Sequence, residues 1–205
     1  MRKVLICFVI CVALIGCAKW PEIVDSVKDV EALPSTTTSI RARGLPDGAV
    51  ASLARLTNLV IIDFNGGSAV EPARITNRGI AILASLQLQH LETLTLGSTE
   101  IADDALADLA KMETVSWLSL SACQKVTDRG IRNLVTMTNL STLDLRGCTK
   151  ITDMGILHLS SMGNLKEVLL GGSIRITSNG VERLRVALPT CKVGKDDREW
   201  AGHGN

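Results

Sequence analysis

A 25-residue repeat runs through the second half of the chain and limits the folds that it can adopt. The segment LSTLDLRGCTKITDMGILHL, residues 140–159, recurs with the same spacing one unit before and one unit after it. Leu120, Leu145 and Leu170 occupy the same place in the three copies and are each 25 residues apart. A fixed period in the twenties is typical of solenoids, in which stacked units together bury a core that one unit could not bury alone.

Each copy divides into a strand part and a helix part. The pattern Leu-x-x-Leu-x-Leu ends in alternating apolar positions, as a strand with one buried face requires. The Thr-Asp step that follows offers a side-chain oxygen to cap a helix and a carboxylate beside the positive helix end. Ile131 with Leu134, and Ile156 with Leu159, are expected to turn inward one helical turn apart. Less regular copies are predicted upstream, at residues 40–53, 59–83 and 91–109.

These units resemble leucine-rich repeats of the cysteine-containing subtype, with the consensus L-x-x-L-x-L-x-x-C-x-x-I-T-D-x-G-I-x-x-L. The resemblance covers residues 40–188, and the ending ALPTCK at 187–192 is similar to the closing segment of such proteins in planctomycete-type bacteria. It implies an α/β fold: a right-handed, curved solenoid with parallel strands on the concave face and helices on the convex face. It also implies a binding role, with no chemistry common to the family.

The first residues are typical of an export signal. A positive n-region precedes the apolar run at residues 4–15, which has the length of a signal-peptide core and is short for a membrane span. The sequence LIGC at residues 14–17 resembles the lipobox of bacterial lipoproteins, which implies cleavage before Cys17 and a lipid attached to it. No aspartate follows Cys17, so an outer-membrane or cell-surface location is expected rather than the inner membrane. An uncleaved anchor helix is the alternative.

Four segments are expected along the chain: a signal peptide at 1–16, a tether or N-terminal cap at 17–39, a leucine-rich-repeat domain of about six repeats at 40–188, and a C-terminal cap with a polar tail at 189–205. An apolar stripe at helical spacing across residues 20–33 favours a capping helix, and residues 35–39 are expected to form a degenerate first strand. Residues 65–74 are an insertion with glycine and proline, expected to be a loop at the solenoid edge. It either borders the binding face or has no role.

The six cysteines separate by segment. Two lie in the signal and Cys17 would carry the lipid, which leaves Cys123, Cys148 and Cys191 in the folded part. Cys123 and Cys148 share one repeat position in neighbouring units, where they are expected to be free, buried and apolar in character. A disulfide between them in an oxidising compartment is the alternative.

Strand residues that alternate with the buried leucines are predicted to point to the concave face. Trp117 lies in the middle of the repeats, and because tryptophan and arginine are enriched at interface hot spots, Trp117 with Asp144 and Arg146 is the predicted contact centre. The other predicted ligand-binding residues are Asp63, Thr93, Thr95, Ser119, Thr142 and Glu167. Alternatively, Trp117 only packs against neighbouring strand side chains, and Asp144 and Arg146 form a solvated ion pair of little energetic weight.

Composition and motifs argue against two other classes of protein. A net charge of +1, no tyrosine and only two phenylalanines do not favour nucleic-acid binding. His90, His158 and His203 are scattered, and no H-x-x-x-H, C-x-x-C, P-loop or G-x-S-x-G pattern occurs. We therefore predict no catalytic residues, no metal site, no cofactor and no enzymatic activity.

The leading hypothesis is a lipid-anchored, extracytoplasmic protein that binds another protein or a cell-envelope polymer on its concave face. One alternative is a structural envelope component without a discrete ligand. Another is a substrate adaptor that resembles the repeat part of F-box proteins, which is disfavoured because an export signal and no F-box precedes the repeats.

Overall fold

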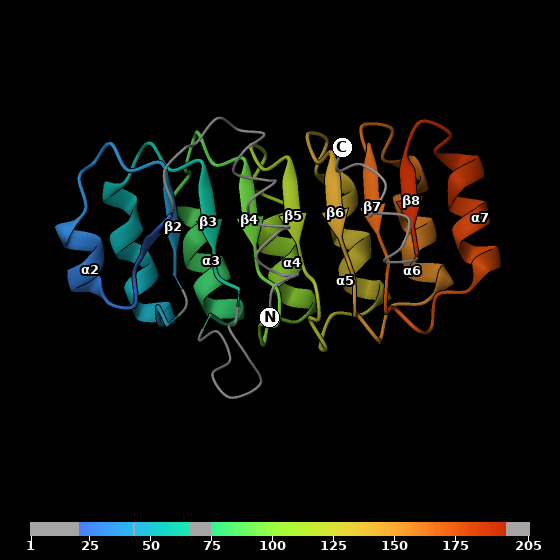
Figure 1. Cartoon of the computed structure of the whole chain (residues 1–205), viewed down its shortest axis with the longest axis horizontal. Coiled ribbons are helices and arrows are strands. Elements are labelled where there is room, and N and C mark those ends of the chain that lie inside the picture. The colour runs from blue at the N-terminus through green and yellow to red at the C-terminus, as the bar shows by residue number, and fades with distance from the viewer. Residues whose placement is uncertain (1–20, 43, 66–74, 196–205) are drawn as a thin grey trace, which may run out of the picture.

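Short parallel strands form one face of the molecule, and a helix on the other face lies between each strand and the next (Figure 1). The computed structural model describes residues 21–42, 44–65 and 75–195. Within them the sheet has eight strands: β1 (Glu22–Ile23), β2 (Ser39–Arg41), β3 (Ile61–Asp63), β4 (Thr93–Thr95), β5 (Trp117–Ser119), β6 (Thr142–Asp144), β7 (Glu167–Leu169) and β8 (Lys192–Gly194). The helices are α2 (Val27–Ala32), the 3-10 helix η1 (Asp47–Arg55), α3 (Asn77–Ser85), α4 (Asp103–Leu109), α5 (Asp128–Asn133) with η2 (Leu134–Thr136), α6 (Asp153–His158) with η3 (Leu159–Ser161), and α7 (Ser178–Ala187).

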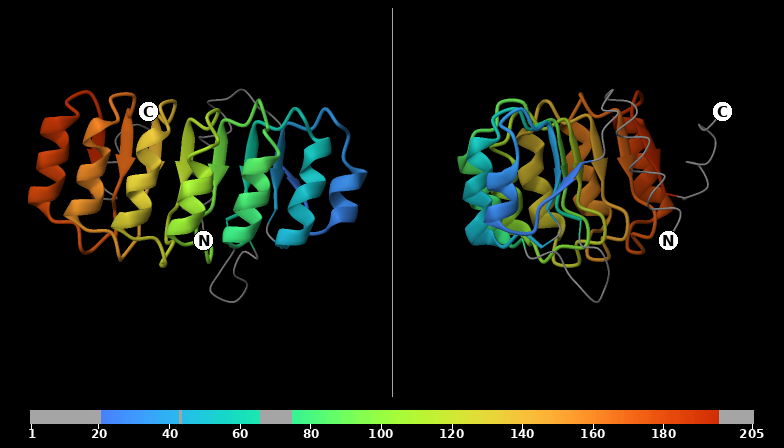
Figure 2. Two further views of the ribbon diagram at one scale, coloured as in Figure 1. Left: turned by 180° about the vertical axis from the view of Figure 1, so that it is seen from behind. Right: turned by 60° about the vertical axis from the view of Figure 1, so that its left-hand side comes forward.

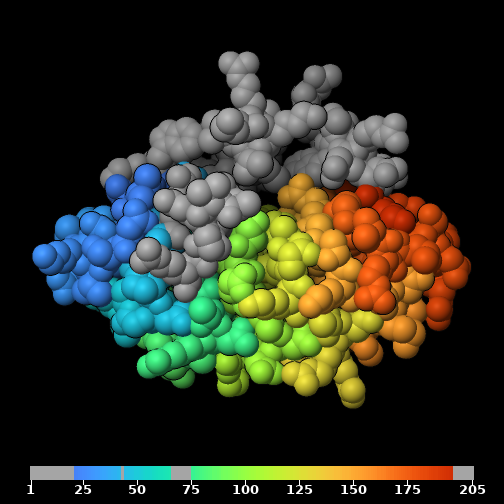
Figure 3. Space-filling model, turned by 90° about the horizontal axis from the view of Figure 1, so that it is seen from below, coloured from blue at the N-terminus to red at the C-terminus, as the bar shows by residue number. Residues whose placement is uncertain are grey.

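One strand and the helix after it make up a coil, so that coil 1 is β1 with α2, coil 3 is β3 with α3, and coil 7 is β7 with α7. The strands pair in the order of the sequence, β1 to β8, and every pair is parallel. Figure 2 shows the helices side by side in a second layer behind the sheet, and Figure 3 shows that the described coils follow an arc. The predicted α/β solenoid is therefore confirmed.

The core lies between the two layers and repeats with the sequence. Leu118 and Leu120 of coil 5 are fully buried, as are their equivalents Leu143 and Leu145. The helix residues predicted to turn inward are also fully buried: Ile131, Leu134, Ile156 and Leu159. Because strands and helices of every coil contribute to one continuous apolar layer, neighbouring coils stabilise each other.

The threonine of the Thr-Asp step begins the helix, as predicted. The side chain of Thr127 accepts a hydrogen bond from the backbone N–H of Arg129 at 3.3 Å, and Thr152 does the same for Met154 at 3.2 Å. The threonines Thr76 and Thr177 cap α3 and α7 in the same way. These oxygens satisfy backbone donors that the first helical turn leaves without a partner.

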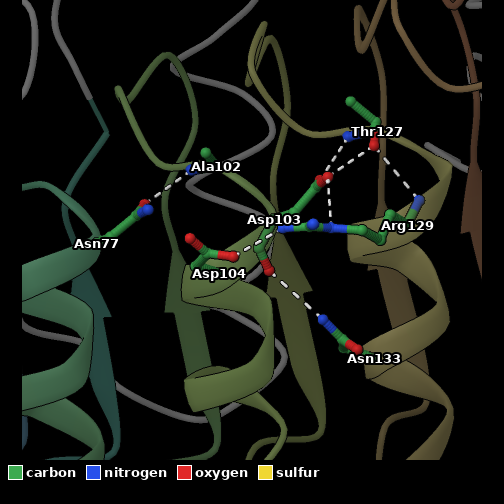
Figure 4. Close-up of polar contacts among 7 residues, drawn as sticks. All are labelled: Asn77, Ala102, Asp103, Asp104, Thr127, Arg129 and Asn133. Carbon is green, nitrogen blue, oxygen red and sulfur yellow. Dashed lines mark hydrogen bonds and ion pairs between the residues drawn. The ribbon is translucent and has the colours of Figure 1, made fainter.

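The aspartate that follows the capping position acts on the neighbouring coil, also where alanine or proline replaces the threonine before it. Asp103 accepts two bonds from Thr127 of the next coil, from the backbone N–H at 2.8 Å and from Oγ1 at 2.7 Å (Figure 4). Asp128 holds Thr152 at 2.8 and 2.6 Å in the same two ways. The pairs Asp47–Thr76 and Asp153–Thr177 repeat the arrangement. We call this contact the aspartate clamp; it joins the cap of one helix to the cap of the next.

The glycine of Thr-Asp-x-Gly makes room for the clamp. A Cβ atom on Gly130 would lie 2.5 Å from Oδ1 of Asp103, and on Gly155 it would also overlap Asp128. Gly79 and Gly180 meet the preceding aspartate in the same way. Glycine is unfavourable inside a helix, so its place here follows from the close approach of the carboxylate.

Cys123 and Cys148 are free and buried, as expected. The Sγ of Cys123 lies 3.2 Å from the carbonyl oxygen of Leu96, and that of Cys148 lies 3.1 Å from Leu120 O, each in the preceding coil. Burial raises the pKa of Cys148 from 9.0 to about 12. Each thiol therefore acts as a neutral, weak donor between coils.

The N-terminal coil differs from the prediction of one helix across residues 20–33. Residues 22–23 instead form β1, which pairs with β2, and α2 begins only at Val27. Ser26 sets this start, because its Oγ accepts from the backbone N–H of Asp29 at 3.3 Å and donates to the carboxylate of Asp29 at 2.8 Å. The predicted strand at 35–39 is likewise shifted, since β2 starts at Ser39.

At the other end, β8 extends the sheet beyond the last recognised repeat. Lys192 donates its N–H to the carbonyl of Lys166 at 2.8 Å. Arg185 of α7 donates from Nη2 to the carbonyl of Val193 at 2.7 Å and thereby covers a backbone acceptor of the outermost strand. At the clamp position α7 has Ser178 where the internal coils have aspartate or asparagine, so the series of clamps ends there.

The signal peptide, Cys17, most of the 65–74 insertion and His203 lie outside the described residues. In the part of the chain that the structure does describe, no helix has both the length and the apolar character needed to cross a membrane.

Candidate binding face

Two rows of side chains run across the strand face of the sheet. The first joins Thr93, Trp117, Thr142 and Glu167, which stand opposite one another in neighbouring strands. The second, two residues further along each strand, joins Asp63, Thr95, Ser119 and Asp144, with Leu169 next to Asp144. Strand alternation thus places all the predicted strand residues on one face.

Exposure divides the predicted ligand-binding residues into two groups. Asp63, Thr93, Thr95, Ser119 and Asp144 are buried, with no more than 4% of any of them exposed. Trp117, Thr142, Arg146 and Glu167 are half-buried. A ligand that approaches the sheet can touch only the second group, which we call the β5–β7 patch.

The buried carboxylate of Asp144 holds the patch residue Arg146 in place. Its carboxylate accepts hydrogen bonds from Nε and Nη2 of Arg146, at 2.9 and 2.7 Å, and from Oγ of Ser119 at 3.2 Å. The backbone N–H of Arg146 adds a fourth bond at 3.0 Å. Arg146 and Asp144 therefore form a bidentate, partly buried ion pair and not a solvated one. Such bonds fix the guanidinium plane, so Arg146 presents a defined surface.

Asp63 supports the other end of the face. It accepts a hydrogen bond from Nε of Arg41 at 3.1 Å and another from Oγ1 of Thr95. The backbone N–H of Asn65 bonds to the same carboxylate at 3.0 Å. Arg41 was missed at the sequence level because the copy that contains it, residues 40–53, is decayed. The register of β2 with β3 is what brings it opposite Asp63.

Trp117 is the aromatic side chain that the described residues expose on this face, since Phe64 is fully buried. Its strand neighbours are Thr93 and Thr142, so small hydroxyl side chains flank the indole on both sides. A large, rigid, partly exposed ring and an ordered arginine in neighbouring coils have the composition of an interface hot spot.

The described residues contain no cluster of three or more His, Cys, Asp or Glu side chains that could hold a metal ion. His158 is the last residue of α6 and His90 lies before β4, so the structure does not bring them together.

Comparison with known proteins gives one sequence match and several structural ones. A family model described as Leucine Rich repeat matches residues 136–160. No curated protein matches the chain. A chain of the yeast Rad7 and Elc1 complex superposes with a TM-score of 0.69 and 17% identity, over 87% of this chain and 48% of that one.

Two further solved structures have the same fold. Internalin C2 from Listeria monocytogenes gives a TM-score of 0.51 with 23% identity, over 81% of this chain and 65% of that one. A chain of a TLR13–ssRNA13 complex gives 0.57 with 17% identity, over 78% of this chain and 22% of that one. This chain spans less than two thirds of each of the three. The repeat match and the superpositions agree with the coils described above, and the chain has the fold of a leucine-rich-repeat solenoid.

Proposed function

We propose that the chain is a lipid-anchored, extracytoplasmic binding protein, and that the β5–β7 patch holds its partner, a protein or a cell-envelope polymer. The observation that carries the proposal is that the half-exposed Trp117 lies one coil away from Arg146, whose position is fixed by the buried carboxylate of Asp144. Preorganised side chains lose little conformational entropy on binding, so such a patch favours association. The LIGC sequence at residues 14–17 supports the anchor.

The anchor is tested by mass spectrometry of the N-terminal peptide from membranes of the native host. We expect a peptide that begins at an acylated Cys17, and no such peptide from the Cys17→Ala variant. An intact, unlipidated Met1 terminus would contradict the lipoprotein proposal and favour the intracellular adaptor.

The patch is tested by photo-crosslinking in whole cells. A photoreactive amino acid at position 142, next to Trp117, is expected to give a crosslinked partner, whereas the same group at Met154 is not. Met154 is a matched control because it is 64% exposed on α6, in the helix layer. Adding Trp117→Ala to the first variant should reduce the crosslink at least tenfold, as expected for a hot spot.

Crosslinks of equal yield from positions 142 and 154 would contradict a binding role for the patch. Crosslinks only to further copies of the chain would indicate lateral assembly, without a discrete ligand.

A further inference from the structure

Three series of side-chain contacts tie the regular coils to the coils before them. The aspartate clamp joins the helix caps. Near the strand ends, the side chains of Cys123, Cys148 and Ser173 each bond to a carbonyl of the preceding coil, which we call the cysteine row. Before the strands, Asn139 and Asn164 each donate to a carbonyl one coil back, at 2.8 and 2.5 Å, which we call the asparagine row.

The clamp is weakest between coils 3 and 4. Asn77 takes the place of the aspartate there, and Ala102 that of the threonine (Figure 4). A single bond remains, from the backbone N–H of Ala102 to Oδ1 of Asn77 at 2.8 Å. No side chain caps α4. This joint therefore has one neutral hydrogen bond, whereas the joints between coils 2 and 3, 4 and 5, 5 and 6, and 6 and 7 each have two bonds to a carboxylate. Bonds to charged groups are the stronger ones.

At the same joint, side chains at or near the other two rows bond within their own coil or segment. Thr99, which stands in the cysteine row, donates its hydroxyl to Leu96 O of its own coil at 2.7 Å. In the asparagine row the equivalent position is His90, and the nearby amide of Gln89 bonds to Gln87 O within the same segment. Among the described residues, neither Thr99 nor His90 sends a side-chain hydrogen bond to coil 3. The segments that follow α3 and α4 are joined by one neutral bond, from Oγ1 of Thr114 to Leu88 O at 3.3 Å.

The strand side of this joint is intact. The N–H of Phe64 bonds to Thr95 O at 2.8 Å, and that of Glu92 to Val60 O at 2.9 Å. The hydroxyl of Thr95 reaches the carboxylate of Asp63 across the two strands. The apolar core also continues, since Ile80 and Leu106 are both fully buried. Coils 3 and 4 are thus held by the sheet and the core, with few polar contacts on the helix side.

We propose that the joint between coils 3 and 4 is a hinge, at which the helices α3 and α4 separate while β3 and β4 stay paired. The helices lie on the outside of the arc, so their separation tightens the curvature of the strand face. In a solenoid each coil contacts only its neighbours, so one weak interface localises the motion. If the β5–β7 patch binds a ligand, as proposed above, this bending moves coils 1 to 3 toward it.

Hydrogen exchange of the purified full chain tests the hinge without any ligand, so the result does not depend on the proposed function. In the wild type, amides of α3 and α4 are expected to exchange faster than those of α5 and α6. The triple variant Asn77→Asp, Ala102→Thr, Ala105→Gly installs the regular clamp, with glycine at position 105 to admit the carboxylate. It should slow exchange in α3 and α4 about tenfold.

The matched control moves the weak joint. Asp128→Asn, Thr152→Ala, Gly155→Ala copies the irregular clamp into the joint between coils 5 and 6, and it should speed exchange in α5 and α6 by a similar factor. The hinge is overturned if wild-type protection is the same on both sides of residue 91 and declines only toward the chain ends. It is also overturned if the repaired variant leaves α3 and α4 unchanged while the control variant speeds α5 and α6.

Discussion

At the scale of single residues, a glycine in the helix allows two neighbouring coils to pack closely. Gly155 sits inside α6, where alanine would ordinarily stabilise the helix by about 1 kcal/mol. The carboxylate of Asp128 occupies the space that a Cβ would need, however, and Ile151 lies against the same position. The steric demand of the clamp therefore outweighs helix propensity.

We predict that Gly155→Ala lowers the free energy of unfolding by about 1–3 kcal/mol, the usual cost of overpacking. Gly163→Ala is the matched control, because a Cβ there meets nothing within 4 Å; it should change stability by less than about 0.5 kcal/mol. Urea unfolding of both variants measures the difference. Equal stability of the two variants would show that the carboxylate can move aside.

The aspartate's role also marks the limit of reasoning from sequence. The Thr-Asp-x-Gly step predicted a capped helix, and the threonines confirm it. That Asp128 bonds to Thr152 of the next coil depends on how coils stack, which one unit's pattern does not encode. The glycine was the available signal, because glycine within a helix indicates a close approach.

At the scale of elements, the turns that follow β4, β5, β6 and β7 each contain a residue with left-handed backbone. The third residue after the strand has φ of 56° at Ser98 and Ala122, and of 70° at Gly147 and 73° at Gly172. A residue with a Cβ costs roughly 1–2 kcal/mol in this conformation, whereas glycine adopts it freely. Coils 4 and 5 therefore contain strain that coils 6 and 7 avoid.

Ala122→Gly should accordingly raise the free energy of unfolding by about 1 kcal/mol, and Gly147→Ala should lower it by a similar amount. The two changes are reciprocal at equivalent positions, so chemical denaturation of both isolates the conformational effect. A loss of stability in Ala122→Gly would contradict it.

Strands and helices with full repeats were predictable, because their leucines alternate and their caps recur. β1 and β8 were not, since strands of two or three residues without the leucine pattern form only by pairing with a neighbour. For the candidate site, the sequence predicted which residues lie on the strand face but not which of them are exposed. Alternation places Asp144 on the strand side, yet its burial depends on Ser119 and Arg146 folding over it.

At the scale of the whole molecule, the buried thiols make stability sensitive to alkaline pH. The pKa of Cys148 rises from 9.0 to about 12 and that of Cys191 to about 11, in both cases mainly through burial, and burial also raises that of Cys123. The folded state therefore keeps its protons at a pH where the unfolded chain has lost them. This contribution to stability is complete below pH 9.0 and is lost as pH rises toward those folded values.

We predict that the free energy of unfolding falls between about pH 8 and about pH 10.5, and that Cys148→Ser reduces this fall. Serine keeps the donor, as Ser173 shows with its 2.8 Å bond to Leu145 O, but it does not ionise in this range. Urea unfolding at both pH values measures the effect. An identical fall in wild type and variant would exclude Cys148 as its source.

The serine at the clamp position of α7 has a consequence for how such a chain can grow. Internal units such as residues 140–164 contain a threonine that donates to the preceding coil and an aspartate that accepts from the following one, so a duplicated copy would find matching partners on both sides. A copy appended after α7 would meet Ser178, which has no carboxylate to offer. Tandem duplication in the genome can therefore lengthen this solenoid from within, while its C-terminal boundary stays where it is.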